Sequence, residues 1–287
     1  MMMRRTQDGF TLVEMVMVIV ITGIIGGMVA VFLKAPIQQY IDVARRADMT
    51  DIADTALRRI GRDLRLALPN SVRVTTGTCP GGAGTCSFLE FLPTSGGGRY
   101  RADVASSGAS AGCGSLAADV LDFSTADNCF EVLGGMPPGF TFAAGDLVAV
   151  YNLGIPGANA YFAQNTAAVN VAGSTTAIIK LNTATLFPFA SPVARFDVIN
   201  QAVYYVCDTT GGTLMRYSYS IGAAPGTTSA LAGGKLLAGN VGAICSFSYD
   251  ALAVAQQRYG LVTMNLAISE DGETITLYSA THVSNVP

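Results

Sequence analysis

The feature that most constrains this chain is an apolar run near its start, from Phe10 to Leu33. At ~1.5 Å per residue, a helix of this length covers about 36 Å, which is enough to cross the hydrocarbon core of a bilayer. Its fourteen Leu, Ile, Val and Phe residues favour insertion by roughly 4 to 8 kcal/mol, against about 3 kcal/mol for its one charged residue, Glu14. The run therefore predicts a single membrane-spanning helix in contact with lipid.

A cleaved secretory signal peptide is the alternative interpretation of this run. Such a signal has an apolar region of about 7 to 15 residues, followed by small residues at a cleavage site. The run here is longer, carries a carboxylate and ends at Lys34-Ala35-Pro36 without such a site. These features favour a retained anchor.

All six cysteines follow the apolar run, and their even number favours disulfides in an oxidising compartment. This location predicts that the leader MMMRRTQDG lies in the cytoplasm and the remainder of the chain in the periplasm. Six cysteines permit fifteen connectivities. We expect sequence neighbours to pair, namely Cys79 with Cys86, Cys113 with Cys129, and Cys207 with Cys245.

Composition and motifs exclude several classes of function. Charged residues make up 13% of the chain and the net charge is -3, so nucleic acid is not an expected partner. One histidine and no C-x-x-C pair leave a zinc site without its usual ligands. We expect no enzymatic activity, no catalytic residue, no metal and no cofactor.

Three motifs that could suggest chemistry lack the context that this chemistry needs. The residues from Gly108 to Gly112 match G-x-S-x-G, but no strand precedes them and no helix follows them. We expect His282, the histidine of that pattern, to be exposed in a terminal strand. The glycines of Gly96-Gly97-Gly98-Arg99 and Gly233-Gly234-Lys235 lack the rest of a phosphate-binding loop, so turns are expected there.

The residues around the start of the apolar run resemble the type IV prepilin signature. Arg4 and Arg5 form a short basic leader that ends at Gly9, and FTLVE opens the apolar helix. The resemblance implies cleavage between Gly9 and Phe10 by a prepilin peptidase, followed by N-methylation of Phe10. It also implies assembly through the helix with other pilin and minor pilin subunits, an inner-membrane assembly platform, and inner-membrane lipid before assembly.

Glu14 is the residue to which this resemblance gives an assembly role. A carboxylate in an apolar environment needs a partner, and the new amine of Phe10 is the nearest candidate, in its own helix or on an adjacent subunit. In the family the partner is usually the neighbour's amine, which sets the axial stagger of the helices. We therefore expect Glu14 to be required for incorporation.

Beyond the membrane the apolar positions continue at helical spacing, which predicts an amphipathic helix that ends near Leu68-Pro69. These positions are Ile37, Tyr40, Ile41, Ala44, Ile52, Ala56, Leu57, Ile60 and Leu64. Pro36 is expected to kink or loosen the helix, helped by Gly23, Gly26 and Gly27. The alternative role of these glycines is close packing between helices.

The remainder of the chain consists of short β-like runs between small-residue loops. The expected strands are 87–92, 146–151, 175–181, 198–207 and 213–220. The turn Glu270-Asp271-Gly272-Glu273 predicts a hairpin, and a plain turn is favoured there over a calcium loop. The predicted fold is α+β, type IV pilin-like, with a long N-terminal helix packed on an antiparallel β-rich head. Its expected parts are a leader (1–9), the transmembrane half of the helix (10–35), the amphipathic half (36–69) and a periplasmic domain (70–287).

Further phrases resemble the larger minor pilins and J-type pseudopilins, above all those of MSHA-type pili. They are Ile60 to Arg65, the phrase LLAGNVGAICSFSYD that begins at Leu236, and the ending from His282 to Pro287. Residues 76–191 carry no such phrase. The resemblance implies a minor pilin that helps to initiate or cap a filament. The alternatives are a tip adhesin, a major shaft subunit or a pseudopilin of a type II secretion system. The expected location is the inner membrane with a periplasmic domain, and then the pilus.

Overall fold

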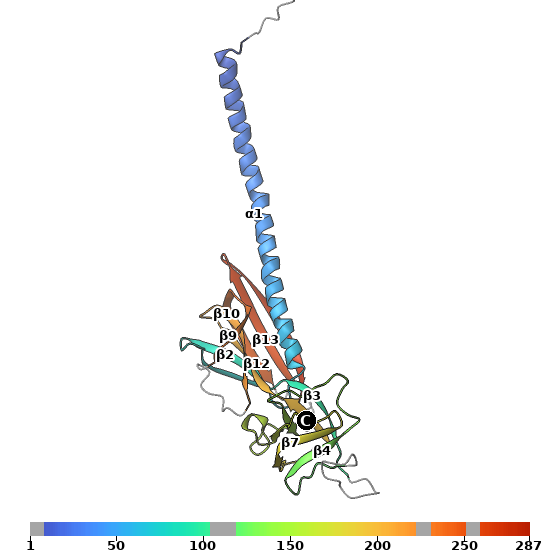
Figure 1. Ribbon diagram of the computed structural model, residues 1–287. Coiled ribbons are helices and arrows are strands. Elements are labelled where there is room, and N and C mark those ends of the chain that lie inside the picture. Colours follow the sequence, from blue (N-terminus) through green and yellow to red (C-terminus); the bar gives the residue numbers. More distant parts are fainter. Residues whose placement is uncertain (1–8, 104–118, 222–230, 251–258) are drawn as a thin grey trace, which may run out of the picture. The chain divides into compact units, whose positions relative to one another are not determined.

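The computed structural model describes residues 9–103, 119–221, 231–250 and 259–287, except for the side chain of Ala35. In these ranges one long helix precedes a series of strands (Figure 1). The elements are α1 (Leu12–Leu64), β1 (Arg73–Thr78), β2 (Thr85–Phe91), β3 (Thr94–Tyr100), β4 (Asp127–Leu133), β5 (Leu147–Val150), the short 3₁₀ helix η1 (Ala160–Phe162), β6 (Thr166–Ala168), β7 (Ile178–Thr185), β8 (Arg195–Ile199), β9 (Gln201–Asp208), β10 (Thr213–Ser220), β11 (Lys235–Ala238), β12 (Val241–Asp250), β13 (Tyr259–Glu270) and β14 (Glu273–Ser284).

The chain divides into two compact units, Met1–Met49 and Thr50–Pro287. The described part of the first unit is almost entirely helical, and the second unit holds the end of α1 together with the strands. The second unit has the predicted α+β architecture, with a helix packed on antiparallel strands.

Helix α1 is continuous through Pro36 and ends at Leu64, four residues before the predicted end. Its last turn tightens, because the amides of Leu66 and Ala67 donate to carbonyls three residues earlier, each at 3.1 Å. Pro69 follows soon after, and helical backbone geometry is disfavoured for the residue that precedes a proline. The end of the helix is therefore set by local chemistry. A bend at Pro36 stays a prediction.

The predicted apolar stripe of α1 is buried only in its last part. Ala56, Leu57, Ile60 and Leu64 are buried, together with Met49 and Ala53, which the spacing argument did not include. The earlier members of the predicted stripe are exposed, namely Ile37, Tyr40, Ile41, Ala44 and Ile52. An apolar period shows which side chains share a face, but not whether another element covers that face.

A polar contact fixes the end of α1 to the strands beside it. The carboxylate of Asp63 accepts hydrogen bonds from the Tyr205 hydroxyl at 2.6 Å and from Nε of Arg216 at 3.2 Å. Tyr205 lies on β9 and Arg216 on β10, and Figure 1 shows this part of α1 beside the strands. Burial raises the pKa of Tyr205 well above its usual value, so the hydroxyl remains a donor.

Three antiparallel sheets make up the second unit in its described residues. Their strand orders are β1-β2-β9-β10-β11, β12-β13-β14 and β6-β5-β8-β3-β4-β7. The six-stranded sheet lines an apolar cluster in which Phe130 and Phe196 meet edge to face at 5.4 Å. Most of this sheet lies in the stretch 76–191, for which the sequence offered no family phrase.

The expected single strand 198–207 is two strands in different sheets, so that prediction was wrong. β8 ends at Ile199 in the six-stranded sheet, and β9 begins at Gln201 in the five-stranded sheet. Asn200 between them is exposed. Apolar residues flank it on both sides because each strand is buried in its own sheet, and the combined run therefore resembles one long strand.

The glycines Gly96, Gly97 and Gly98 lie in strand β3, so the prediction of a turn there was also wrong. A Cβ on Gly96 would lie 2.5 Å from the Phe140 ring, and one on Gly98 would lie 3.0 Å from the Phe196 ring. The glycines are thus needed for the close approach of aromatic rings, a role that glycine also has inside strands. Around Gly233, by contrast, the chain does bend, with a positive φ of 73°.

The hairpin predicted at Glu270–Glu273 is present. Asp271 and Gly272 form its two-residue loop with φ values of 48° and 82°, the positive values that a tight hairpin turn requires. From this turn β13 and β14 pair over twelve positions without a shift in register. His282 is exposed in β14, as expected.

Candidate assembly site at the N-terminal helix

The predicted cleavage point lies just before the helix. Gly9 and Phe10 have no regular secondary structure, both are exposed, and no described residue beyond the chain neighbours lies within 4 Å of a Cβ placed on Gly9. Because a peptidase must bind its substrate in an extended form, a scissile bond is better placed before the helix than inside it. The leader residues Arg4 and Arg5 lie outside the described residues. Cleavage between Gly9 and Phe10 stays a prediction.

Thr11 and Glu14 form one half of a capping box at the start of α1. The Thr11 hydroxyl accepts a hydrogen bond from the Glu14 amide at 3.3 Å, and the Thr11 carbonyl accepts the first helical bond from Met15 at 3.1 Å. The pattern T-x-x-E is the sequence signal for this cap. Our sequence argument did not use it, although the signal was present.

The position of Glu14 gives its carboxylate two favourable environments. It lies in the first turn, where the positive end of the helix dipole stabilises a negative charge. Its side chain is exposed, so it can also reach a group outside its own helix. Glu14 is therefore placed both to support the helix start and to bind a cation on another molecule.

The surface of α1 from Leu12 to Leu33 is a continuous layer of exposed apolar side chains, with Ile19 62% exposed and Phe32 80% exposed. Among the described residues, α1 is the one helix long and apolar enough to cross a membrane, and none of its most apolar window is buried in the chain. Exposed apolar area on this scale is unfavourable in water. This helix with its prepilin motif is consistent with membrane anchoring.

Polar and small residues inside this layer do not disturb it. The Thr22 hydroxyl donates to the Val18 carbonyl at 2.6 Å, so it requires no partner from outside. A Cβ on Gly23, Gly26 or Gly27 would meet nothing within 4 Å. Nothing among the described residues therefore requires glycine at these positions, and their expected roles in flexibility or helix packing stay predictions.

Two disulfides join described residues of the second unit, and both link pairs expected from the sequence. Cys79–Cys86 closes the loop between β1 and β2, and Cys207–Cys245 joins β9 of the five-stranded sheet to β12 of the three-stranded sheet. Cys129 is disulfide-bonded as well. Its expected partner, Cys113, lies outside the described residues.

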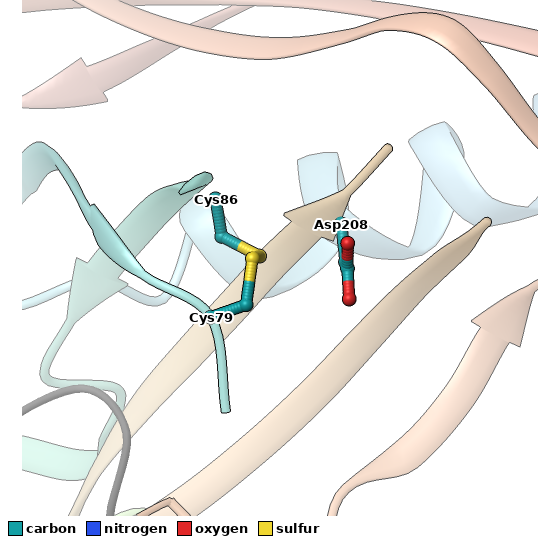
Figure 2. A group of neighbouring side chains, drawn as sticks. All are labelled: Cys79, Cys86 and Asp208. Carbon is teal, nitrogen blue, oxygen red and sulfur yellow. A yellow bond between two sulfur atoms is a disulfide. The ribbon is translucent and has the colours of Figure 1, made fainter. Parts of the chain in front are cut away.

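One group in the described ranges has the spacing of a metal site, and its chemistry excludes that role. Cys79, Cys86 and Asp208 lie within 4.8 Å of one another (Figure 2). The two sulfurs are bonded to each other, so neither is the thiolate that a metal would bind. Asp208 instead accepts hydrogen bonds from the amides of Thr210 and Gly211 at 2.9 and 2.7 Å, which holds the turn after β9.

The serine-hydrolase pattern at Gly108 to Gly112 lies outside the described residues. The hairpin turn at Asp271 and Gly272 has the geometry of a plain two-residue loop.

Comparison with known proteins gives one match. A family model described as the prokaryotic N-terminal methylation motif matches residues 4–30. No curated protein and no solved structure matches this chain. Residues 4–30 therefore carry the prepilin signal of type IV pilin-like proteins, which indicates a structural subunit of the pilin or pseudopilin kind with partners in a pilus or its assembly machinery.

Proposed function

We propose that this chain is a minor pilin of a type IV pilus of the MSHA type, which enters the filament through α1 and helps to initiate or cap assembly. The observation that carries the proposal is the methylation motif at residues 4–30 at the head of a long helix whose most apolar window is not buried in the chain. A helix that binds lipid before assembly and sister helices afterwards needs such a surface in both states.

The finer assignment rests on sequence phrases outside the motif. The run Ile60 to Arg65, the phrase from Leu236 to Tyr249 and the ending at Pro287 resemble larger minor pilins such as MshO of the MSHA system. The size of the second unit also supports a minor role, because more than two hundred residues is large for a repeated shaft unit. A type II secretion pseudopilin and a tip adhesin are the alternatives.

The proposal includes the processing of the N-terminus. Prepilin peptidase cuts after Gly9, and the new amine of Phe10 is methylated. In the filament that amine binds the Glu14 carboxylate of an adjacent subunit. Pairing the two buried charges offsets the cost of removing each of them from water, and so it fixes the stagger of neighbouring helices.

Mass spectrometry of the mature protein tests the processing step. The expected N-terminus is N-methyl-Phe10 in membrane and filament fractions. A mature chain that begins after Lys34 would contradict the proposal, because it would lack the assembly helix.

Abundance and deletion separate the remaining roles. An initiating or capping subunit is scarce in purified filaments, and its deletion lowers the number of pili per cell. A shaft subunit would dominate the filament. Deletion of an adhesin would leave piliation normal and remove attachment, and deletion of a secretion pseudopilin would leave piliation normal and block secretion.

A further inference from the structure

A groove of about 530 Å³ lies between the end of α1 and strand β14. From the helix, Arg58, Arg62 and Arg65 line it at spacings of four and three residues, which places them on one helix face. From β14 it is lined by three consecutive residues, Ser279, Ala280 and Thr281. Every one of these residues belongs to the second unit.

The groove borders the free edge of β14. Consecutive residues of a strand point to opposite faces, so three in succession can line one groove only where the main chain itself forms the wall. The other edge of β14 is paired with β13 along its whole length, and no strand among the described ranges pairs with the outer edge. At the end of the groove Gly61 permits close approach, because a Cβ there would lie 3.1 Å from Oγ1 of Thr281.

The main-chain groups that face outward can be assigned from the hairpin register. A two-residue loop closes on a hydrogen-bonded pair, Glu270 and Glu273, and such pairs then alternate along the strands. The amide of Ser269, next to this pair on β13, accordingly points away from β14 and donates to Asn240. The even-numbered residues of β14, from Thr274 to Ser284, therefore direct their N–H and C=O groups to the outer edge.

Strand β14 lacks the devices that usually protect an edge strand from pairing. Such strands are normally short, bulged or interrupted by proline or charged residues. β14 has twelve residues in regular register and no proline, and its one Asp, Glu, Lys or Arg residue is Glu273 at its start, with His282 near its end. Its outer edge is thus a regular template for another strand.

The charge of the groove defines what such a strand would carry. Arg58 is paired with Asp54 at 2.6 Å, whereas Arg62 and Arg65 are exposed and make no ion pair within the described part of the chain. Asp63 does not neutralise them, because it binds Tyr205 and Arg216. The positions of Arg62 and Arg65 differ by about 4.5 Å along the helix axis, about 2 Å less than the ~6.7 Å between alternate residues of a strand.

We propose that this groove binds an extended acidic segment of a neighbouring subunit, which adds as a strand to β14 and pairs its carboxylates with Arg62 and Arg65. Main-chain hydrogen bonds give the affinity, and the arginines select acidic side chains at alternate positions. The proposal rests on the proposed function only where it identifies the donor of the segment as a neighbouring subunit.

Peptide binding to the full-length protein in zwitterionic detergent micelles tests the groove directly. The probe is a fluorescent acetyl-Thr-Val-Glu-Val-Glu-Val-Thr-amide, measured by anisotropy. Two matched probes carry Gln for both Glu residues, or N-methyl groups on the amides of one edge. We expect each change to weaken binding at least tenfold. Equal binding of the N-methylated probe would mean charge attraction without strand pairing and would overturn the proposal, as would no binding of any probe at millimolar concentration.

Variants of the protein test the same two components. Arg62→Gln combined with Arg65→Gln should weaken binding at least tenfold, whereas Arg59→Gln, an exposed arginine of the same helix outside the groove, should have no effect. Ala280→Pro removes one outward amide and spares the bonds to β13, so it should also weaken binding. The N-methylated probe needs no change to the protein, so the test holds even if the proline variant does not fold.

The outcomes also separate this proposal from the proposed function. Failure of the peptide test with N-methyl-Phe10 present in filaments would remove the groove but leave the pilin assignment. Peptide binding by a chain that never enters filaments would support the groove but remove the pilin assignment.

Discussion

The apolar N-terminal segment of α1 and the β-rich unit treat apolar side chains in opposite ways, the first exposing them and the second burying them. Ile60 in the second unit is fully buried by its own chain, whereas Ile24 in the first is 54% exposed. The second unit holds its core between sheets and closes it with disulfides. The segment from Leu12 to Leu33 depends on lipid or other helices. The difference teaches that one unit carries its own stability and the other acquires it from its environment.

The same contrast applies to recognition. The first segment is identified by a short run of residues, because its contacts are local to one helix and its surface is uniform. The second unit gives no match to a solved structure, and its features follow from pairings between distant parts of the chain.

The largest expected effect is the loss of filament incorporation when Glu14 is replaced. Two variants test whether Glu14 acts through its charge or through helix capping. Glu14→Ala should leave membrane insertion and cleavage intact but abolish incorporation into filaments, because the buried amine of the neighbour loses its partner. Glu14→Gln keeps the capping ability that Glu and Gln share and removes only the charge. Filament incorporation is measured by immunoblot of sheared pili.

The glutamine variant decides between the two roles of Glu14. Loss of incorporation in both variants assigns the effect to the charge. Normal incorporation of Glu14→Gln with loss in Glu14→Ala would instead assign it to the cap, and normal incorporation of both would refute the assembly role.

The second prediction compares the two isoleucines directly. Ile60→Ala should lower the free energy of unfolding of the second unit by about 2 to 5 kcal/mol, because it leaves a cavity in a closed core. Ile24→Ala should change it by less than about 0.5 kcal/mol. Urea unfolding in micelles, followed by tyrosine fluorescence, gives both values. An equal loss in the two variants would mean that the units are not independent.

The third prediction concerns how the stability of the second unit depends on pH. Burial raises the pKa of Asp197, on β8, to about 6 from 3.8. Because the folded protein holds this proton more tightly, the stability it contributes is full below about pH 3.8 and falls as pH rises to about 6. Asp197→Asn should remove this pH dependence. The free energy of unfolding of the variant, relative to that of the natural protein, should therefore increase with pH by as much as about 3 kcal/mol.

The nearby Arg195 provides the control for this measurement, since its charge lowers the pKa of Asp197. Arg195→Gln should move the sloping region to higher pH. Urea midpoints between pH 3 and pH 8 record both shifts. A flat difference between the asparagine variant and the natural protein across this range would mean that Asp197 is solvated.

The smallest expected effect concerns the cap of α1. Thr11→Ala removes the acceptor of the Glu14 amide and should cost about 1 kcal/mol of local stability. Amide hydrogen exchange at Glu14 should accelerate about fivefold, while exchange in the second unit stays the same. Thr11→Ser keeps the hydroxyl and should exchange like the natural protein. Acceleration that extends to the strands would break the comparison between the two units.

The sequence was sufficient where the physical determinants were local. The span from Phe10 to Leu33, the hairpin loop at Asp271-Gly272 and strand β10 all follow from patterns within a few residues. The capping box at Thr11 and Glu14 belongs to the same class. It could have been found, because T-x-x-E is itself the signal.

The sequence was insufficient where distant segments decide the structure. The change of sheet at Asn200 depends on different partners for β8 and β9, and the glycines of β3 depend on the rings of Phe140 and Phe196. The groove at β14 could not be foreseen either, because it requires the arginines of α1 and the free strand edge, more than two hundred residues apart, to lie side by side. Periodicity contains none of this long-range information.

The bond between Cys207 and Cys245 also has a mechanical meaning. A chain under tension lengthens only where its segments are free to extend. The disulfide prevents the residues between the two cysteines from extending. Their separation of 38 residues corresponds to roughly 130 Å of extended chain. Under tension the oxidised protein would therefore have a maximum extension shorter than that of the reduced protein by about this length.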